Sequence, residues 1–393
     1  VSEENIKILF DLKEKFLLNS TDMKKAEYST EQLMEIWNSI IEIDESLRNV
    51  KILDPAVWSW AFPMGLLHEI SSLRYYMYIV FDKIFKEKLN TYKDKNWSIS
   101  LYLIKKEIIL NNIHWIDIDP GAIDIAKLRF RLSLVVDEEN PEPLPNFEFK
   151  FVCANSLIPL EEWSLFTKAD VIEKLKNLRD EYYRCDDKDG KGILKNKFYD
   201  IKRELTWFWK SRADFQSKKE RNDYLLQSYS ANSDQRNRQI LEWDPFETKE
   251  YTKRTDTELM LWQDKFDIVI WNPPYFLVKP GEELNLYKKR FKYSNSGKTN
   301  IYRLFIEFAI VFCLKEQWIM CYINPNDYLT SIQWSWIRDL IINHCKVKEI
   351  IEYSESDKVF ENVTQAVTTL LLRKWFENNN IFNLRTAKQW FQK

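Results

Sequence analysis

Short apolar runs alternate with longer amphipathic segments along most of this chain. The runs have the length of buried strands, and several of them stop at a polar or proline-containing stretch. Between them, apolar residues recur every three or four positions, as on one face of a helix. Strand, helix, strand, helix, strand in this order predicts an α/β fold with a doubly wound, mostly parallel sheet. The predicted strands are residues 50–53, 113–116, 147–152, 268–270, 318–323, 347–353 and 366–372, and the main predicted helices are 66–88, 98–111, 122–134, 301–314 and 335–344.

Three segments depart from this rhythm. Residues 1–48 predict an N-terminal helical segment, in which Ser29–Gln32 opens the second of two helices. Residues 158–262 are rich in charge and predict a long helical insertion, which would leave 49–157 and 263–374 as the sheet-bearing domain. From residue 375 to 393 the pattern dissolves, as expected for the start of a missing C-terminal region.

Composition limits the possible partners. A chain of 393 residues with 45% hydrophobic content is long enough for one large domain with insertions, or for two. The formal charge of −2 gives no overall attraction to nucleic acid, so DNA binding would need local basic patches. Five scattered cysteines and three histidines predict no metal site and a reduced, cytoplasmic setting. No apolar run is long enough to predict a membrane span.

The segment from Asp267 to Tyr275 carries the clearest candidate chemistry. Its apolar strand stops at Asn272-Pro273-Pro274-Tyr275, where two prolines enforce a stiff loop. In open α/β sheets, ligands bind at the carboxyl ends of strands. The side-chain oxygen of Asn272 and the carbonyl of Pro273 could accept both hydrogens of a planar amino group, while Tyr275 stacks on the ring. The alternative is a strand-ending turn with a buried Asn and a packing Tyr.

Two further features suit a ligand site. Asp117 and Asp119 follow the second predicted strand, where such folds bind ribose hydroxyls, and we expect Asp119 to cap the next helix while Asp117 binds. Downstream, basic residues are interleaved with aromatic ones, which favours contact with phosphates and bases, although a solvated loop explains the stretch equally well. The basic candidates are Lys288, Lys289, Arg290 and Lys292.

Four motifs in a fixed order resemble a known family. They are Asp54-Pro55-Ala56 with Ser59 and Phe62, Asp117-Ile118-Asp119-Pro120, Asn155-Ser156-Leu157, and Asn272-Pro273-Pro274-Tyr275. Over about residues 48–374 the chain resembles the gamma-class adenine-N6 DNA methyltransferases, in the large subgroup of type IIG restriction–modification and phage-defence enzymes. The resemblance implies a Rossmann-like methyltransferase sheet, S-adenosylmethionine as cofactor and double-stranded DNA as substrate. It also implies a nuclease or specificity domain in missing parts of the chain or in a separate subunit.

The resemblance assigns roles to single residues. Asp117 would bind the ribose hydroxyls, Ile118 one face of the cofactor adenine, and Asn155 its edge. The target adenine would be flipped out of the duplex into the pocket of Asn272, Pro273, Pro274 and Tyr275, with Phe360 packing on its other face. The methionine part of the cofactor would be surrounded by Asp54, Pro55, Ala56, Trp58, Trp60 and Phe62.

One departure from the family pattern bears on activity. Trp58 and Trp60 stand near the end of the first loop, where the family has small residues that let the backbone approach the cofactor. The chain has 6 Gly and 16 Trp, whereas average usage of about 7% predicts roughly 27 glycines. We hypothesise that the source organism reads the UGA codon as glycine and that the sequence was translated with Trp at those codons, including Trp115, Trp271 and Trp318. As written, weak or absent cofactor binding is expected.

Two alternative functions stay open from the sequence. RNA methyltransferases and protein-glutamine methyltransferases can share Asn-Pro-Pro-Tyr, but they are usually compact and lack a long charged insertion. If Trp58 and Trp60 are genuine, the chain could instead be a catalytically dead, DNA-binding or scaffold relative.

Overall fold

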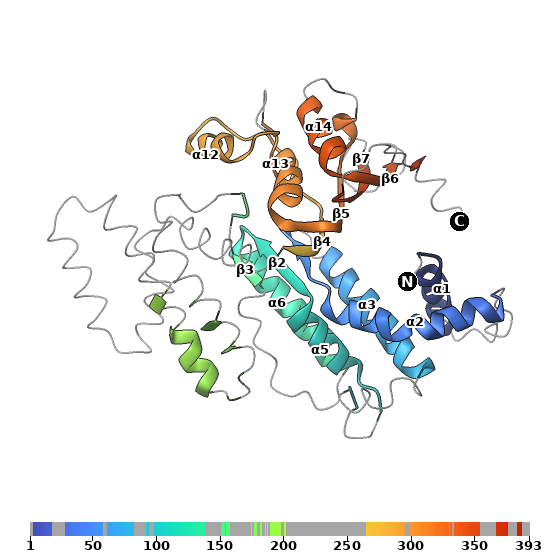
Figure 1. Ribbon diagram of the computed structural model, residues 1–393. Helices are drawn as coiled ribbons and strands as arrows, with labels where there is room; N and C mark the ends of the chain where they lie inside the picture. Colours follow the sequence, from blue (N-terminus) through green and yellow to red (C-terminus); the bar gives the residue numbers. More distant parts are fainter. Residues whose placement is uncertain are drawn as a thin grey trace.

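A computed structural model gives the arrangement of the chain (Figure 1). Trp58, Trp60 and Phe360 lie outside the described residues, as does most of the predicted insertion. The structure describes residues 3–17, 28–57, 61–81, 92–93, 98–137, 151–153, 155–157, single positions and short runs between 174 and 201, 265–294, 299–329, 331, 334–353, 367–375 and 383–386.

The described strands form one mixed sheet in the order β3-β2-β1-β4-β5-β7-β6-β8. Neighbours from β3 through β5 are parallel, β6 and β8 are also parallel, and β7 runs antiparallel to both β5 and β6. The predicted α/β fold with a mostly parallel sheet is therefore confirmed. The strands are β1 (Ile52–Asp54), β2 (Ile113–Asp117), β3 (Phe151–Cys153), β4 (Phe266–Trp271), β5 (Leu314–Pro325), β6 (Lys346–Tyr353), β7 (Val367–Arg373) and β8 (Asn383–Thr386).

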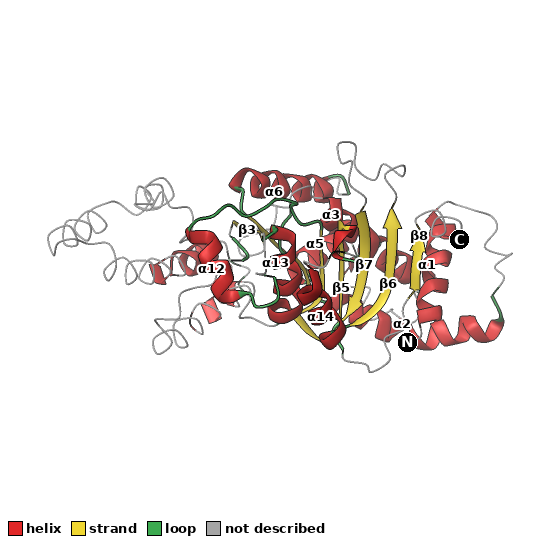
Figure 2. Ribbon diagram, turned by 90° about the horizontal axis from the view of Figure 1, so that it is seen from above, coloured by secondary structure: helices red, strands yellow, loops and turns green. Residues whose placement is uncertain are grey.

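Helices cover both faces of this sheet (Figures 1 and 2). One core cluster joins α1, α2, α3, α5 and α6 to the sheet, and the other joins α12, α13 and α14 to it. Side chains alternate between faces along a strand, so Ile52 belongs to the first cluster and its neighbour Leu53 to the second. The helices are α1 (Glu3–Leu17), α2 (Thr30–Asn49), α3 (Ala61–Val80), α5 (Leu101–Asn111), α6 (Pro120–Val135), α12 (Glu282–Arg290), α13 (Ile301–Glu307), which continues as a π-helix (Phe308–Cys313), and α14 (Ser335–His344).

The chain changes direction in the sheet at the β1–β4 pair. From β1 it builds outward through β2 to β3, and it later returns on the other side of β1 with β4 and then β5. Asp267 fixes the start of β4, because its carboxylate accepts from the backbone N–H of Lys51 at 2.7 Å and from Nζ of Lys315 at 2.8 Å. The strand order therefore reverses between β1 and β4, and open α/β sheets bind ligands beyond the carboxyl ends of the strands at such a point.

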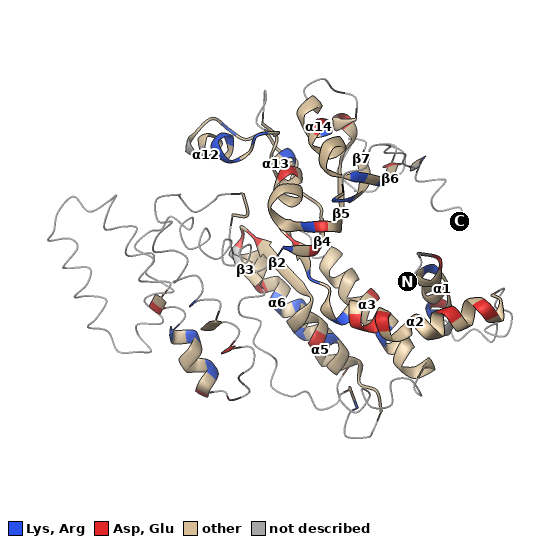
Figure 3. Ribbon diagram, viewed as in Figure 1, with Lys and Arg blue, Asp and Glu red and all other residues tan. Residues whose placement is uncertain are grey.

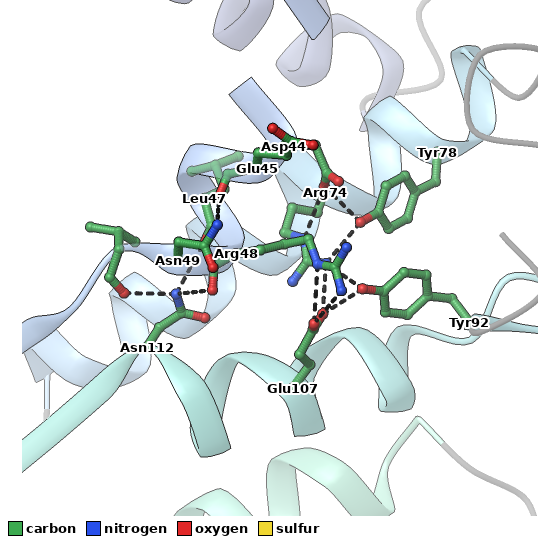
Figure 4. Close-up of polar contacts among 11 residues, drawn as sticks. Asp44, Glu45, Leu47, Arg48, Asn49, Arg74, Tyr78, Tyr92, Glu107 and Asn112 are labelled. Atoms are coloured by element: carbon green, nitrogen blue, oxygen red, sulfur yellow. Dashed lines mark hydrogen bonds and ion pairs between the residues drawn. The ribbon is translucent and has the colours of Figure 1, made fainter. Parts of the chain in front are cut away.

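A buried polar network ties the N-terminal helices to the rest of the fold (Figure 4). Nη2 of Arg74 on α3 lies 2.7 Å from Glu107 of α5, 2.7 Å from the hydroxyl of Tyr78 and 2.9 Å from that of Tyr92. Tyr78 in turn donates to Asp44 of α2 at 2.6 Å. Burial alone would lower the pKa of Arg74, but Tyr78 and Glu107 raise it, so the guanidinium stays charged inside the helical layer.

Several element boundaries differ from the sequence prediction. The opening of α2 is confirmed, since Ser29 and Gln32 form a reciprocal capping box. The fifth strand begins at Leu314 rather than at residue 318, and Gln317 takes a φ of 70° within it, paired with Lys374. Strand β8 was not predicted. The solvated-loop interpretation of the basic stretch is wrong for residues 287–290, which form the end of α12.

Among the described residues, no helix has the length and apolar character needed to cross a membrane.

Candidate functional site

The polar candidates gather where neighbouring parallel strands end. Asp54 closes β1, Asp117 closes β2, and Asn155 and Asn272 follow β3 and β4. Because β3, β2, β1 and β4 are adjacent and parallel, these four positions share one edge of the sheet. Four of the predicted site residues are thus brought to one edge of the sheet.

Asp54 is a buried carboxyl at the centre of this edge, with 4% of its surface exposed. One of its oxygens accepts from the backbone N–H of Ala56 at 3.1 Å. Burial raises the pKa of Asp54 well above its ordinary value; the Ala56 hydrogen bond opposes the shift and the nearby Asp117 adds to it. The following Pro55 is buried, and Phe62 is half-buried on α3. An acid desolvated in this way is suited to a ligand that brings a positive charge.

The two aspartates at and after the end of β2, Asp117 and Asp119, make different contacts. Asp119 is the N-cap of α6 and accepts from the N–H of Gly121 at 2.9 Å, which confirms the predicted cap. Asp117 is 8% exposed and accepts from the N–H of Asp119 at 2.8 Å. Between them, Ile118 is 54% exposed at the tip of the turn. Asp117 therefore stays at the strand end, with an open apolar side chain beside it.

The turn after β3 is held from several directions. Oδ1 of Asn155 accepts from the N–H of Leu157 at 3.0 Å, and its Nδ2 donates to the hydroxyl of Tyr287 at 3.2 Å. Ser156 donates to the carbonyl of Pro55 at 2.6 Å, which joins this turn to the loop after β1. Nη1 of Arg290 donates to the carbonyl of Leu157 at 2.9 Å. Both Tyr287 and Arg290 come from α12.

The Asn272–Tyr275 loop is braced by its own side chains. The hydroxyl of Tyr275 lies 2.6 Å from Oδ1 of Asn272 and 2.8 Å from the carbonyl of Ile323, at the end of β5. Burial raises the pKa of Tyr275, so its hydroxyl stays neutral and has one proton to donate. Pro273 is buried, whereas Asn272 and Tyr275 are half-buried at the edge. The loop therefore holds the Asn272 amide in place beside the ring of Tyr275.

A second aromatic layer stands behind Tyr275. Its ring meets Tyr302 edge to face, with centroids 5.9 Å apart, and Tyr302 stacks on Trp334 at 4.8 Å. Tyr302 also donates to Asp327 at 2.5 Å, and the guanidinium of Arg303 lies 3.5 Å from the centre of the Trp334 ring. Sequence reasoning missed this layer, because its members follow different strands and helices. The only signal was the polar stretch that begins at Asn324, at the end of β5.

Trp271, beside Asn272, points into the core rather than toward the site. It is fully buried and stacks on Tyr322 with ring centroids 5.1 Å apart. Its indole nitrogen is buried without a hydrogen-bond partner among the described residues. A buried N–H without a partner destabilises a fold. The polar group of the indole therefore contributes nothing favourable at this strand position.

Basic residues lie on α12, where Figure 3 marks them in blue, and the candidates on and after this helix differ in how exposed they are. Lys288, Lys289 and Lys292 are exposed. Arg290 instead turns inward, with its guanidinium 4.6 Å from the centre of the Phe312 ring. Tyr287 is also buried, so it offers no ring to a base. The three lysines therefore remain available for contact with DNA, whereas the Arg290 guanidinium is turned away from solvent.

The donor set of this edge fits a ligand with hydroxyls and a positively charged group. Two buried carboxyls, Asp54 and Asp117, end adjacent strands. The exposed side chain of Ile118 and the buried amide of Asn155 flank them. Oxygen acceptors of this kind bind hydroxyls and ammonium groups. The loop after Val57, which the resemblance places around the same ligand, lies outside the described residues.

Comparisons with known proteins place the chain among restriction-modification enzymes. A sequence model described as Eco57I restriction-modification methylase matches residues 111–360. RM.MjaORFECS2P of Methanocaldococcus jannaschii, named as a type II restriction enzyme and methyltransferase, is 23% identical over an alignment of 358 positions that covers 78% of this chain and 28% of that protein. The type II methyltransferase M.AccI of Acinetobacter calcoaceticus is 26% identical over 113 residues, 28% of this chain and 21% of that protein. The chain thus spans about a quarter of the length of these relatives.

Solved structures give weaker likenesses. A nuclease-deletion mutant of the Type ISP restriction-modification enzyme LlaGI, in complex with a DNA substrate mimic, aligns with a TM-score of 0.45 and 10% identity over 86% of this chain and 21% of that one. The DrdV–DNA complex aligns with a TM-score of 0.41 and 11% identity over 86% of this chain and 25% of that one.

Proposed function

Because the chain belongs to the Eco57I restriction-modification methylase family, we propose that it transfers a methyl group from S-adenosylmethionine to the N6 amino group of an adenine in double-stranded DNA. The observation that carries the proposal is the Asn272-Pro273-Pro274-Tyr275 loop at the end of β4, beside the buried Asp54 at the end of β1. The loop that would bind the amino group and the carboxyl that would face the charged cofactor then lie at the ends of adjacent strands of a Rossmann-like sheet.

The proposed chemistry needs acceptors more than a base. The lone pair of a nucleobase amino group is delocalised into the ring, so the group is a poor nucleophile. Oδ1 of Asn272 and the carbonyl of Pro273 would accept its two hydrogens and localise the lone pair on nitrogen. Tyr275 would hold the ring at attack distance, and Phe360 would pack on the opposite face. The nitrogen would gain the methyl group as the bond between the methyl carbon and the sulfonium sulfur breaks, which leaves S-adenosylhomocysteine, and the methylated nitrogen would lose one proton to water.

The cofactor would be held by residues of three strand ends. Asp54 would face its charged part, with Pro55, Ala56, Trp58, Trp60 and Phe62 around it. Asp117 would accept from the ribose hydroxyls, Ile118 would cover one face of the adenine, and Asn155 would lie at its edge. When bound, S-adenosylmethionine supplies an activated methyl group.

The DNA partner is proposed from the same family membership and from the exposed lysines of α12 and the turn after it. Lys288, Lys289 and Lys292 would contact phosphates, which position a protein on DNA without reading its sequence. A nuclease or specificity domain would lie in further parts of the protein or in a separate subunit, since the relatives extend well beyond the matched region.

Calorimetric titration with S-adenosylmethionine tests the cofactor assignment. The chain as it stands is compared with a Trp58→Gly, Trp60→Gly variant, and binding by the variant is expected to be the tighter. Absence of binding by both chains would favour the scaffold alternative. Equal binding would show that these indoles do not obstruct the cofactor.

Transfer of a labelled methyl group to duplex DNA tests the reaction in whichever chain binds the cofactor. Asn272→Ala should lower transfer at least about hundredfold, the usual cost of removing a transition-state hydrogen bond, while cofactor affinity stays unchanged. Retained transfer by Asn272→Ala would remove this residue from the mechanism, and labelled RNA or protein in place of DNA would identify a different substrate.

A further inference from the structure

Helix α12 follows the Asn272–Tyr275 loop in the chain and contacts the turn after β3. The helix begins at Glu282, seven residues after Tyr275, and its last turn lies against the Asn155–Leu157 turn. We infer that Tyr287 and Arg290 are positioning residues that hold the Asn155–Leu157 turn in the geometry that receives the adenine of the cofactor. The inference rests on the proposed function, which places Asn155 at the edge of that adenine.

The first link is between two buried side chains. Nδ2 of Asn155 donates to the hydroxyl of Tyr287 at 3.2 Å, while Oδ1 of Asn155 accepts from the N–H of Leu157. Asn155 is 8% exposed and Tyr287 is 2% exposed. A primary amide has two donor hydrogens and one oxygen, so this pairing fixes the plane of the amide and directs its second N–H. The orientation of Asn155 is therefore set by a residue of α12.

The second link acts on the backbone of the same turn. Nη1 of Arg290 donates to the carbonyl of Leu157 at 2.9 Å, and its guanidinium packs over Phe312 and Phe308 at 4.6 and 5.3 Å from the ring centres. A planar guanidinium held between rings and a carbonyl has little freedom. Arg290 therefore anchors the far end of the turn whose near end is held by Tyr287.

The segment that carries these side chains is itself immobilised. Glu307 of α13 is 2% exposed and accepts from the backbone N–H groups of Lys292, Tyr293 and Ser294 at 2.7, 3.0 and 2.8 Å. Phe291 is fully buried at the end of the helix. The C-terminal end of α12 is thus fixed to the core on one side and to the Asn155–Leu157 turn on the other, as a positioning element requires.

Hydrogen exchange of the purified chain without ligand tests the positioning links directly. In Tyr287→Phe the amide of Asn155 loses the Tyr287 hydroxyl as an acceptor but the ring remains, so exchange at the Leu157 N–H should accelerate about fivefold, as expected for loss of one neutral hydrogen bond. Tyr353→Phe is a matched control, because the Tyr353 hydroxyl also accepts one side-chain hydrogen bond at 3.2 Å, from Thr369 on the distant β7. Unchanged exchange at Leu157 in Tyr287→Phe would overturn the inference.

Ligand selectivity tests whether the turn receives adenine. S-adenosylhomocysteine and S-inosylhomocysteine differ only at the edge of the base, so the ratio of their dissociation constants reports on that edge. Tyr287→Phe and Arg290→Met should each reduce this ratio at least about threefold, and Tyr353→Phe should not. A preserved ratio in both variants overturns the assignment to adenine. If the starting chain and its Trp58→Gly, Trp60→Gly variant bind neither compound, the proposed function fails, while the exchange experiment still judges the links.

Discussion

The Asp54 carboxyl is buried at the end of β1, beside a second carboxyl at the end of β2. Burial raises its pKa well above the ordinary value, so the folded chain binds a proton at Asp54 more tightly than the unfolded chain does. Stability is then lost as the pH rises from the ordinary pKa of an aspartate through the raised value. At neutral pH the burial of this acid therefore lowers the stability of the folded protein, and a bound cation would reduce that loss.

Replacing this acid should stabilise the protein and impair its function. Asp54→Asn keeps an oxygen for the Ala56 N–H but carries no charge. The melting temperature should rise by at least about 2 °C at neutral pH, and the gain should shrink toward about pH 4, where the unfolded chain is protonated as well. Scanning calorimetry across pH measures both. A gain that does not depend on pH would show that ionisation of Asp54 is not its source.

The ring and the hydroxyl of Tyr275 make separable contributions. Tyr275→Phe removes the contacts with Asn272 and Ile323 but keeps the ring, and methyl transfer should fall by no more than about tenfold. Tyr275→Ala removes the ring as well, and transfer should fall at least about hundredfold. Steady-state rates on duplex DNA, with melting temperatures as a control for folding, compare the two. Equal losses would assign the whole effect to the hydroxyl.

At the scale of elements, α12 presents two different faces. Lys288 and Lys289 are exposed on it, whereas Tyr287 and Arg290 face the Asn155–Leu157 turn. The same helix would therefore contact phosphates outward and hold the cofactor turn inward. Substitutions on the two faces should affect different measurements.

Salt dependence of DNA binding separates these faces. Lys288→Ala with Lys289→Ala should weaken binding to a mixed-sequence duplex and lower the slope of log affinity against log salt by about 1 to 2, because one or two phosphate contacts are lost. Arg290→Met is the matched control, since its guanidinium is turned inward, and it should leave the slope unchanged. A reduced slope in Arg290→Met would instead place that guanidinium on DNA.

The contact of α2 with α3 and α5 depends on a buried ion pair. Glu107→Gln removes the carboxylate that lies 2.7 Å from the fully buried guanidinium of Arg74 and leaves it Asp44, at 3.5 Å, as its remaining carboxylate partner. The free energy of unfolding should fall by about 3 kcal/mol, measured by urea denaturation. Glu14→Gln removes an exposed partner of Lys13, which keeps Glu69 at 2.7 Å, and should cost less than about 1 kcal/mol. Similar losses in both variants would mean that burial of the pair is unimportant.

For the whole molecule, the sequence predicts the parts of the fold that local patterns determine. Strong apolar runs correctly indicated the strands from β1 to β7, and polar residues after β1, β2 and β4 indicated the edge that carries the site. Strand β8 could not be predicted, because Asn383–Thr386 has no strand pattern and is defined by its pairing with β6. The early start of β5 depends in the same way on pairing of Gln317 with Lys374.

The site was predicted less fully than the sheet, for the same reason. The capping role of Asp119 could be predicted from the local sequence, because Pro120 follows it at the start of α6. The contact of Tyr287 with Asn155 joins residues 132 positions apart, and neither side chain signals the other in the sequence. The stretch of lysines and aromatic residues therefore predicted a surface for contact with DNA. In the fold its lysines are exposed, whereas Tyr287 and Arg290 face the Asn155–Leu157 turn.

The adjacency of β1 and β4 has a consequence for how the chain can be divided. Each half of the site comes from one side of the segment between residues 201 and 265, so a covalent connection there raises the local concentration of one half near the other. Two polypeptides, 1–201 and 265–393, should assemble when produced together, through the β1–β4 pairing, the Lys51–Asp267 bond and the contacts of α12 with the Asn155–Leu157 turn. Copurification through a tag on one piece measures this, and substitution of Asp267 by Ala should weaken it. Assembly of the two pieces would mean that these contacts, rather than an unbroken chain, hold the two halves of the sheet together.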